Sequence, residues 1–218
     1  MINGKVNIGV VGAGKLGTYH LQKFQKISTC NLIGIYDINE DILDKYQKEY
    51  KVGVFNSLEN LLKQCDAISI ATPTINHYEI AKLAIEKGLH LFIEKPITDK
   101  LQDALALKSL AKENIIQVGH VERFNSAFQK SLEYINNPQF IEIHRISPFP
   151  KRSLDIPVVM DLMIHDLDIL LSINHNNKIK DIKASGASVV TDHIDLANAR
   201  IEFEDGLVAN LTASRISA

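Results

Sequence analysis

Three ionisable side chains recur at helical spacing in the apolar segment "VVMDLMIHDLDILLSI", residues 158–173. In a single α-helix, Asp161, His165 and Asp168 would share one narrow stripe, and only Asp166 would lie well off it. A helix that is apolar around most of its circumference is usually buried, and buried carboxylates are costly unless they are paired or hydrogen-bonded. The stripe therefore predicts either an acid/base site, because imidazole can accept a proton near neutral pH, or a polar pair that supports a core.

Lys95 is the second candidate for chemistry. It follows an apolar run in "FIEKPIT", at the expected carboxyl end of a strand, which is the edge where ligands lie in open α/β sheets. A protonated lysine there can donate a hydrogen bond to an oxygen on which negative charge develops. The alternative is a salt bridge with Glu94 or an exposed loop charge.

A glycine turn, "GVVGAGKLG", places Gly12, Gly14 and Gly17 in the G-x-G-x-x-G pattern, with Lys15 and Leu16 inside it. The turn follows an apolar run and precedes a helix-like segment. The glycines would let a pyrophosphate approach closely, and the helix would offer it free N–H groups. This context predicts a dinucleotide site, although such a turn also serves strand-to-helix packing alone.

Asp37 ends the next apolar run, "LIGIYD", about 20 residues beyond the last glycine, where an acidic residue binds ribose. Its carboxylate can accept hydrogen bonds from both ribose hydroxyls and would repel a 2′-phosphate. The neighbouring Ile38 and Asn39 offer no cation to compensate. The predicted cofactor is therefore NAD rather than NADP.

These residues need a scaffold, and the chain up to residue 119 has the alternation of apolar runs and helical patterns that predicts a doubly wound parallel sheet. We expect one domain over residues 1–119. Over residues 120–218, a strand-like run, the buried helix and later strands with a turn at "EDG" predict an α+β domain. The expected strands of the first domain are "VNIGVV", "NLIGIYD", "AISIAT", "LHLFIE" and "IIQVG".

The 218-residue composition, with 45% hydrophobic residues, 23% charged residues and a formal net charge of -2, gives no general attraction to nucleic acid or anionic membranes. Cys30 and Cys65 lack metal-ligand spacing, which favours free thiols. No signal peptide or membrane-spanning run is evident, so we expect a cytoplasmic protein. The segment "TDHIDL", residues 191–196, holds possible ligands, but we interpret it as an exposed polar turn and assign no metal.

The glycine turn, Asp37, "ATPTINHYEIA", "EKP" and "DLMIHDLD" occur in an order and at separations that resemble the glucose-fructose oxidoreductase, inositol dehydrogenase and MocA (Gfo/Idh/MocA) family. The resemblance covers essentially the whole chain. It implies an NAD-binding Rossmann domain followed by a substrate domain with an open, mostly antiparallel sheet. It also implies that Lys95 lies near the reacting hydroxyl and the nicotinamide, that Asp161 is the helix aspartate, and that His165 is the acid/base residue.

The same resemblance places Thr72, Pro73, His77 and Glu94 beside the cofactor, together with Lys95. For His77, a helix-start histidine without a role in the chemistry is the alternative. The opening stripe would then face substrate and nicotinamide, whose hydroxyl and positive charge offset its buried polarity.

Within this family, "VGHVERFNSA" (residues 118–127) looks most like the UDP-N-acetylglucosamine 3-dehydrogenases, which implies Arg123 and Asn125 as substrate contacts. A diphosphate could be bound by four basic residues in this part of the chain, namely Arg123, Arg145, Lys151 and Arg152. The segment "FPKRS", which holds the last two, also fits a solvated loop. The expected reaction is transfer of a hydride from a secondary sugar hydroxyl, at C3 of a nucleotide sugar, to NAD. The alternatives are an inositol-type polyol dehydrogenase and a non-catalytic protein that binds NAD and sugar as a regulator.

The chain stops at Ala218, just after an expected strand, whereas family members usually continue with further strands. We therefore expect the second domain to be incomplete at its C-terminus relative to the family. A missing strand would leave an open sheet edge that needs a partner or a cover. The expected partners are a small sugar substrate and a second copy of the chain, which would bind through the sheet of this domain.

Overall fold

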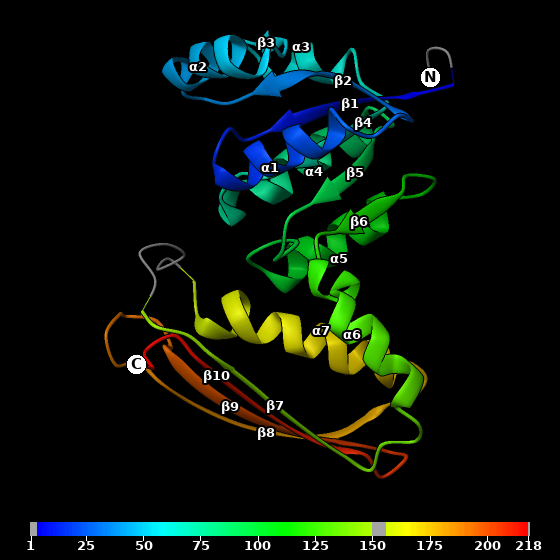
Figure 1. Cartoon of the computed structure of the whole chain (residues 1–218), viewed down its shortest axis with the longest axis vertical. Helices are drawn as coiled ribbons and strands as arrows, with labels where there is room; N and C mark the ends of the chain where they lie inside the picture. Colours follow the sequence, from blue (N-terminus) through cyan, green and yellow to red (C-terminus); the bar gives the residue numbers. More distant parts are fainter. Residues whose placement is uncertain (1–3, 150–155, 218) are drawn as a thin grey trace. The chain divides into compact units, whose positions relative to one another are not determined.

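The computed structural model describes residues 4–149 and 156–217, which form two compact units with their boundary between Gly119 and His120 (Figure 1). Each unit has its own sheet and its own apolar core. Both predicted fold classes are confirmed, and the assignment of one unit to cofactor and the other to substrate stays a prediction. No helix in the described ranges is long and apolar enough to cross a bilayer.

The first unit alternates strands with helices. Its strands are β1 (Val6–Val11), β2 (Cys30–Tyr36), β3 (Val54–Phe55), β4 (Ala67–Ile70), β5 (His90–Ile93) and β6 (Ile116–Val118). Its helices are α1 (Lys15–Phe24), α2 (Glu40–Tyr50), α3 (Leu58–Leu62), α4 (His77–Glu86) and α5 (Leu101–Leu110), and a 3-10 turn, η1, spans Thr74–Asn76. The apolar runs predict every strand except β3, which is too short to give a pattern.

The strands of this sheet are all parallel, in the order β3-β2-β1-β4-β5-β6. The order reverses between β1 and β4, and doubly wound sheets bind ligands at such a point, outside the carboxyl ends of the strands. Gly12 follows β1, Asp37 follows β2, Thr72 lies just beyond β4, and Glu94 follows β5. The topology therefore brings the predicted cofactor residues to one edge.

Helices cover both faces of this sheet, because successive residues of β1 point to opposite sides. Val10 packs with Leu21 of α1, whereas Val11 packs with Leu61 of α3 and Ala84 of α4. Leu21 and Leu61 are fully buried, and burial of each such side chain contributes about 1.5–3 kcal/mol. This packing fixes the strand ends that carry the candidate site.

The second unit begins with short helical turns and continues with a mixed sheet. Its helical segments are η2 (Val121–Phe124), α6 (Ser126–Ser131), η3 (Leu132–Tyr134), η4 (Val159–Met163) and α7 (Ile164–Ile173). Its strands are β7 (Phe140–Ile146), β8 (Ile179–Ala187), β9 (Leu196–Phe203) and β10 (Val208–Ser214). The predicted hairpin at "EDG" joins β9 to β10, with Gly206 at a positive φ of 93°.

The second sheet has the order β7-β10-β9-β8, with β10 parallel to β7 and both other pairings antiparallel. Helix α7 lies along one face (Figure 1), where alternate residues of β9 and β10 are buried. Several of these are small, including Ala199, Ala209 and Ala213, and they allow the helix to approach the sheet closely. Leu170 of α7 is fully buried in this core.

The helix that carries the predicted stripe is not a uniform α-helix. Its first turn, η4, is a π-helix in which the N–H of Ile164 donates to the carbonyl oxygen of Val159, five residues back. The prediction of regular 3.6-residue spacing from Asp161 to His165 is therefore wrong, because the wider turn changes the angle between them. Single π turns of this kind occur often at functional sites.

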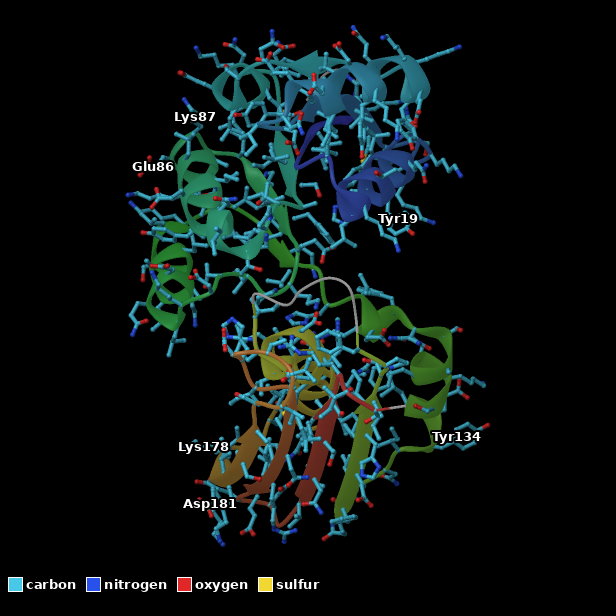
Figure 2. All side chains as sticks on the ribbon, turned by 90° about the vertical axis from the view of Figure 1, so that its left-hand side faces the viewer. Tyr19, Glu86, Lys87, Tyr134, Lys178 and Asp181 are labelled. Atoms are coloured by element: carbon cyan, nitrogen blue, oxygen red, sulfur yellow. The ribbon has the colours of Figure 1, made fainter. Side chains whose placement is uncertain are left out.

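Strand β8 forms one edge of the second sheet, and every one of its residues is exposed. Lys178, just before the strand, and Asp181 within it extend away from the sheet (Figure 2). On the sheet face away from α7, Phe140 and Ile146 of β7 and Leu196 of β9 are exposed apolar residues. This face is therefore polar in its centre and apolar near both ends.

A buried ion pair joins the residue before β9 to the residue after β10. Asp195 and Arg215 both have fully buried side chains, and Arg215 Nε lies 2.8 Å from Asp195 Oδ1. The N–H groups of Val189, Val190 and Thr191 also donate to Asp195. The interpretation of "TDHIDL" as exposed polar residues is therefore wrong for Asp195, whose partners lie in two separate parts of the chain.

Candidate functional site

The glycine turn between β1 and α1 depends on two glycines for close backbone contact. Gly12 has a positive φ of 101°, and a Cβ there would lie 2.7 Å from the carbonyl oxygen of Ala71. A Cβ on Gly17 would lie 1.8 Å from the carbonyl oxygen of Gly12. These two glycines let α1 and the segment after β4 pack against the turn.

Gly14 differs from both, because a Cβ built on it has no heavy atom within 4 Å. Its φ of −79° also suits any residue, so neither packing nor backbone strain requires glycine there. It caps the N-terminus of α1, where free N–H groups face an approaching anion. An open cradle at a helix N-terminus, formed by a residue without a side chain, fits the pyrophosphate of NAD.

Lys15 and Leu16 lie in the first turn of α1, and both are exposed. Tyr19 extends outward from the same helix (Figure 2), and Lys15 Nζ lies 6.0 Å from the centroid of its ring. Lys15 therefore places a positive charge on an exposed side chain beside the helix N-terminus, where a phosphate would be attracted. Its contact with the cofactor stays a prediction, as does that of Leu16.

Asp37 is held by the backbone of the glycine turn. Its Oδ2 accepts a hydrogen bond of 2.6 Å from the N–H of Ala13, and its Oδ1 accepts one of 2.9 Å from the N–H of Asn39. Tyr46 of α2, which is 4% exposed, donates its hydroxyl to the carbonyl oxygen of Ala13 at 2.8 Å. The proposed ribose-binding carboxylate and the glycine turn are therefore one connected structure, and sequence reasoning missed Tyr46.

His77 ties together the two segments that follow β4 and β5. It is 1% exposed, and its Nε2 lies 2.9 Å from the carbonyl oxygen of Thr72 while its Nδ1 lies 2.9 Å from that of Pro96. The Thr72 hydroxyl is buried and has no hydrogen-bond partner among the described residues, so it is available to a ligand. Pro73 follows directly and is the N-cap residue of η1. Cofactor contacts of Thr72, Pro73 and His77 stay predictions.

Glu94 and Lys95 come directly after β5, and the Glu94 side chain is 9% exposed. Glu94 Oε1 lies 2.9 Å from His20 Nε2, and Oε2 accepts a hydrogen bond of 3.2 Å from the Lys95 N–H. His20 Nδ1 in turn lies 2.7 Å from Ser69 Oγ. Sequence reasoning missed His20 and Ser69. The signal was available for His20, because it falls with Gly17, Leu21 and Phe24 at buried-face spacing on α1.

Asp161 and His165 lie on η4 and α7 of the second unit, and both are half-buried. Lys95 belongs to the first unit. A single site containing all three residues stays a prediction. Within the second unit, the structure does place Asp161 and His165 on one continuous helical segment.

The two other helix acids bind arginines of their own unit. Arg123 Nε and Nη2 lie 2.6 and 2.5 Å from the two carboxylate oxygens of Asp168, and Arg145 Nη2 lies 2.7 Å from Asp166. The hydrogen bonds to Asp168 raise the pKa of the Arg123 guanidinium above its usual value, against the opposing effect of partial burial. Asp168 therefore belongs to an ion pair, and a diphosphate would share both arginines with carboxylates.

Asn125, the other predicted substrate contact, caps α6: its Oδ1 accepts a hydrogen bond of 3.0 Å from the Ala127 N–H. This gives Asn125 a local structural role, and its role toward substrate stays a prediction. Lys151 and Arg152 lie outside the described residues.

The comparison with protein families decides the broad identity. The Gfo/Idh/MocA model, described as an oxidoreductase family with an NAD-binding Rossmann fold, matches residues 6–120. The chain belongs to this family. The predicted fold, family and cofactor, NAD, are therefore confirmed. The family match covers the glycine turn, Asp37 and Lys95, and so includes the whole candidate cofactor edge of this Gfo/Idh/MocA protein.

Two curated proteins that this chain resembles are dehydrogenases by name. The chain is 40% identical over 211 residues to the UDP-N-acetylglucosamine 3-dehydrogenase of Acidithiobacillus ferrooxidans, covering 95% of this chain and 66% of that enzyme. A solved structure of that enzyme has a TM-score of 0.90, 39% identity, and coverage of 100% of this chain and 71% of the other. The chain is also 27% identical to the myo-inositol 2-dehydrogenase of Thermotoga maritima, covering 96% of this chain and 69% of that enzyme. The chain thus spans about two thirds of the length of its curated relatives.

Proposed function

We propose that this protein is an NAD-dependent dehydrogenase that oxidises a secondary hydroxyl of a nucleotide sugar, with UDP-N-acetylglucosamine, oxidised at C3, as its substrate. The observation that carries this proposal is the 40% identity to a UDP-N-acetylglucosamine 3-dehydrogenase over 95% of the chain. The open cradle at Gly14 and the carboxylate of Asp37 support the choice of cofactor.

Each candidate residue has a distinct task in this proposal. NAD, when bound at the cofactor edge, would supply the acceptor for the hydride that leaves the carbinol carbon. The carbinol hydroxyl must lose its proton as the carbonyl forms, and the imidazole of His165 takes that proton. Lys95 donates a hydrogen bond to the same oxygen and stabilises the negative charge that develops on it. Asp161 orients His165 and balances the charge of Lys95.

The two arginines proposed to bind the diphosphate differ in how exposed their side chains are. Arg123 has a side chain that is 48% exposed even though it is paired with Asp168, so about half of this side chain is accessible to a ligand such as a diphosphate. Arg145 is more enclosed, since its side chain is 30% exposed and its partner Asp166 is 1% exposed. We therefore propose Arg123 as the diphosphate contact, with Asn125 beside it in the chain.

The test is formation of NADH, followed by its absorbance, with UDP-N-acetylglucosamine, UDP-glucose, N-acetylglucosamine and myo-inositol as separate substrates. We expect the first to give the highest kcat/KM, and we expect the variant Lys95→Ala to lose most of this activity in the same assay. Preference for myo-inositol would replace the nucleotide sugar with a polyol. Tight NAD binding without turnover of any substrate would favour a non-catalytic sensor.

We also propose that the protein forms a homo-oligomer through the second sheet. The sheet face away from α7 exposes Phe140, Ile146 and Leu196, and apolar residues on one open face favour a protein contact. Light scattering after size-exclusion chromatography tests this proposal. We expect a dimer or larger species in the unmodified protein and a monomer after Phe140→Glu with Ile146→Glu.

A cytoplasmic location is proposed from the cysteines. Cys30 and Cys65 are both free thiols in the structure. Burial, together with the negative charge of Asp66, raises the pKa of the Cys65 thiol to about 12, so it stays protonated and unreactive at neutral pH. Unpaired thiols suit a reducing compartment.

A further inference from the structure

The segment that carries Lys95 is tied to the cofactor-binding helix through a chain of buried polar groups. The chain runs from Ser69 of β4 to His20 of α1, then to Glu94, and ends at the Lys95 N–H. The four residues come from two separate elements, β4 and α1, and from the loop after β5. Together they connect a helix that faces the pyrophosphate to the residue proposed to act at the reacting oxygen.

The strand pattern explains why these groups meet. Ser69 pairs in register with Val10 of β1 on one side and with Phe92 of β5 on the other. Val10 faces α1, so Ser69 and Phe92 face α1 as well, and Glu94, two residues beyond Phe92, begins on the same side. His20 stands over this row, with its ring edge-on to Phe92 at a centroid distance of 5.2 Å.

The hydrogen bonds define which atoms donate. A carboxylate can only accept, so for a neutral His20 the Nε2–H donates to Glu94 Oε1 and Nδ1 accepts from the Ser69 hydroxyl. Ser69 is fully buried, and the side chains of His20 and Glu94 are 14% and 9% exposed. In such a place an unpaired hydroxyl or carboxylate is unfavourable, so each group constrains its neighbour.

Gly119 restricts the carboxylate from the other side. A Cβ on Gly119 would lie 3.2 Å from Glu94 Oε2, so the end of β6 leaves room for this carboxylate and for little else. The backbone is held as well, since the Glu94 N–H donates to Ile70 and the Gly119 N–H donates to Ile93. With both oxygens engaged and its backbone fixed, Glu94 has one defined position in which it can accept from the Lys95 N–H.

We infer that His20 is a positioning residue that acts through Glu94 to hold the Lys95 peptide in place beside the cofactor site. This inference rests on the proposed function for the catalytic role of Lys95, but the contact itself is independent of turnover. Glu94, which the family resemblance placed beside the cofactor, here acts through its hydrogen bonds to His20 and to Lys95. Positioning of this kind matters because a displacement of about 1 Å can lower a rate on the order of a hundredfold.

Two amide substitutions distinguish the contact that His20 Nε2 makes with Glu94 from the contact that Nδ1 makes with Ser69. His20→Gln places an amide near the position of Nε2 and retains a donor for Glu94, whereas His20→Asn places its amide near Nδ1 and retains only the contact with Ser69. Both remove the ring from Phe92, so they share the same loss of packing. We expect His20→Asn to lower kcat for UDP-N-acetylglucosamine on the order of tenfold to a hundredfold, with KM for NAD changed less than about threefold. His20→Gln should recover most of that loss.

A measurement without substrate separates this inference from the proposed function. The exchange of the Lys95 amide hydrogen, followed by NMR, should be at least about tenfold faster in His20→Asn than in His20→Gln, because only the latter keeps Glu94 in place. The Ile93 amide serves as the internal control and should exchange equally in both. Equal Lys95 exchange in the two variants would overturn the inference even if the enzyme is active, and unequal exchange would support it even if no sugar is oxidised.

If the enzyme turns over, a double substitution tests whether His20 acts through Lys95. In a Lys95→Ala background, replacing His20 with Asn should lower kcat by less than about twofold, because the residue that it positions is gone. A full additional loss in that background, or a loss that appears chiefly as weaker NAD binding, would show that His20 acts on the cofactor helix and not on Lys95.

Discussion

Gly14→Ala should weaken NAD binding without unfolding the protein. The added Cβ would meet no heavy atom within 4 Å, and the φ of −79° is favourable for alanine, so the fold has room for the methyl group. Loss of a glycine N-cap and the lower entropy of the unfolded alanine chain act in opposite directions, and each is about 1 kcal/mol or less. We therefore expect the free energy of unfolding to change by less than about 1 kcal/mol.

The same methyl group would lie where we expect the pyrophosphate to approach the turn. Insertion of one carbon into a close contact typically costs about 1–3 kcal/mol, which corresponds to binding weakened about fivefold to 150-fold. Calorimetric titration with NAD measures this loss, and thermal unfolding without NAD measures stability. An NAD affinity equal to that of the unmodified protein would refute the hypothesis that the pyrophosphate binds against Gly14.

Gly17→Ala is the matched control for this prediction. Its Cβ would lie 1.8 Å from the Gly12 carbonyl oxygen, so α1 would have to move away from the turn. We expect a destabilisation of about 3 kcal/mol or more, seen in thermal unfolding without any ligand. The two alanines, three residues apart, should therefore affect different quantities: one the affinity for NAD, the other the stability of the fold.

Three further substitutions test separate parts of the structure. Asp37→Ala should narrow the preference for NAD over NADP, because it removes the charge that would repel a 2′-phosphate, and titration with both cofactors checks this. His165→Ala should lower kcat about a hundredfold or more with NAD affinity nearly unchanged, and full activity in the folded variant would assign the base to another group. Burial disfavours the charged form of Asp195, but the N–H groups of Thr191, Val190 and Val189 and the Arg215 guanidinium outweigh it and hold its pKa well below the usual range. Its stabilising effect is therefore present above about pH 4 and is lost as the pH falls toward the folded pKa, so Asp195→Asn should lower Tm at pH 7 and flatten the fall of Tm below about pH 4. Parallel Tm curves for the two proteins from pH 7 to pH 3 would contradict this.

The sequence predicts the parts of the fold that depend on local patterns. The runs around Val10 and Ile68 alternate with helical segments, and the glycine turn and Asp37 follow known strand ends, so the sheet and the cofactor edge are predictable. The π turn at Asp161 is not, because one wider hydrogen bond leaves no trace in an apolar pattern. His20 and Glu94 are 74 residues apart, and only the strand order brings them together.

Buried charge is the second feature that local patterns miss. The sequence predicts that Asp195 lies in an exposed turn, because the nearby Asp192 and His193 are polar. Its partner, Arg215, follows β10 and is 20 residues away in the sequence. The pairing depends on β9 and β10 lying side by side in antiparallel register. Residues of this type are recognisable only once the sheet topology is known.

The exposed edge of the second sheet has a consequence for how the protein behaves at high concentration. A strand with free N–H and C=O groups along one side is a template on which another copy can add a strand and begin aggregation. In β8 the first half carries Lys180, Asp181 and Lys183, whose charges oppose such growth. The second half, from Ala184 to Ala187, carries no charge at all. Strand addition along this edge should therefore start at the end of β8 nearer to Ala187, and a single lysine there should reduce it.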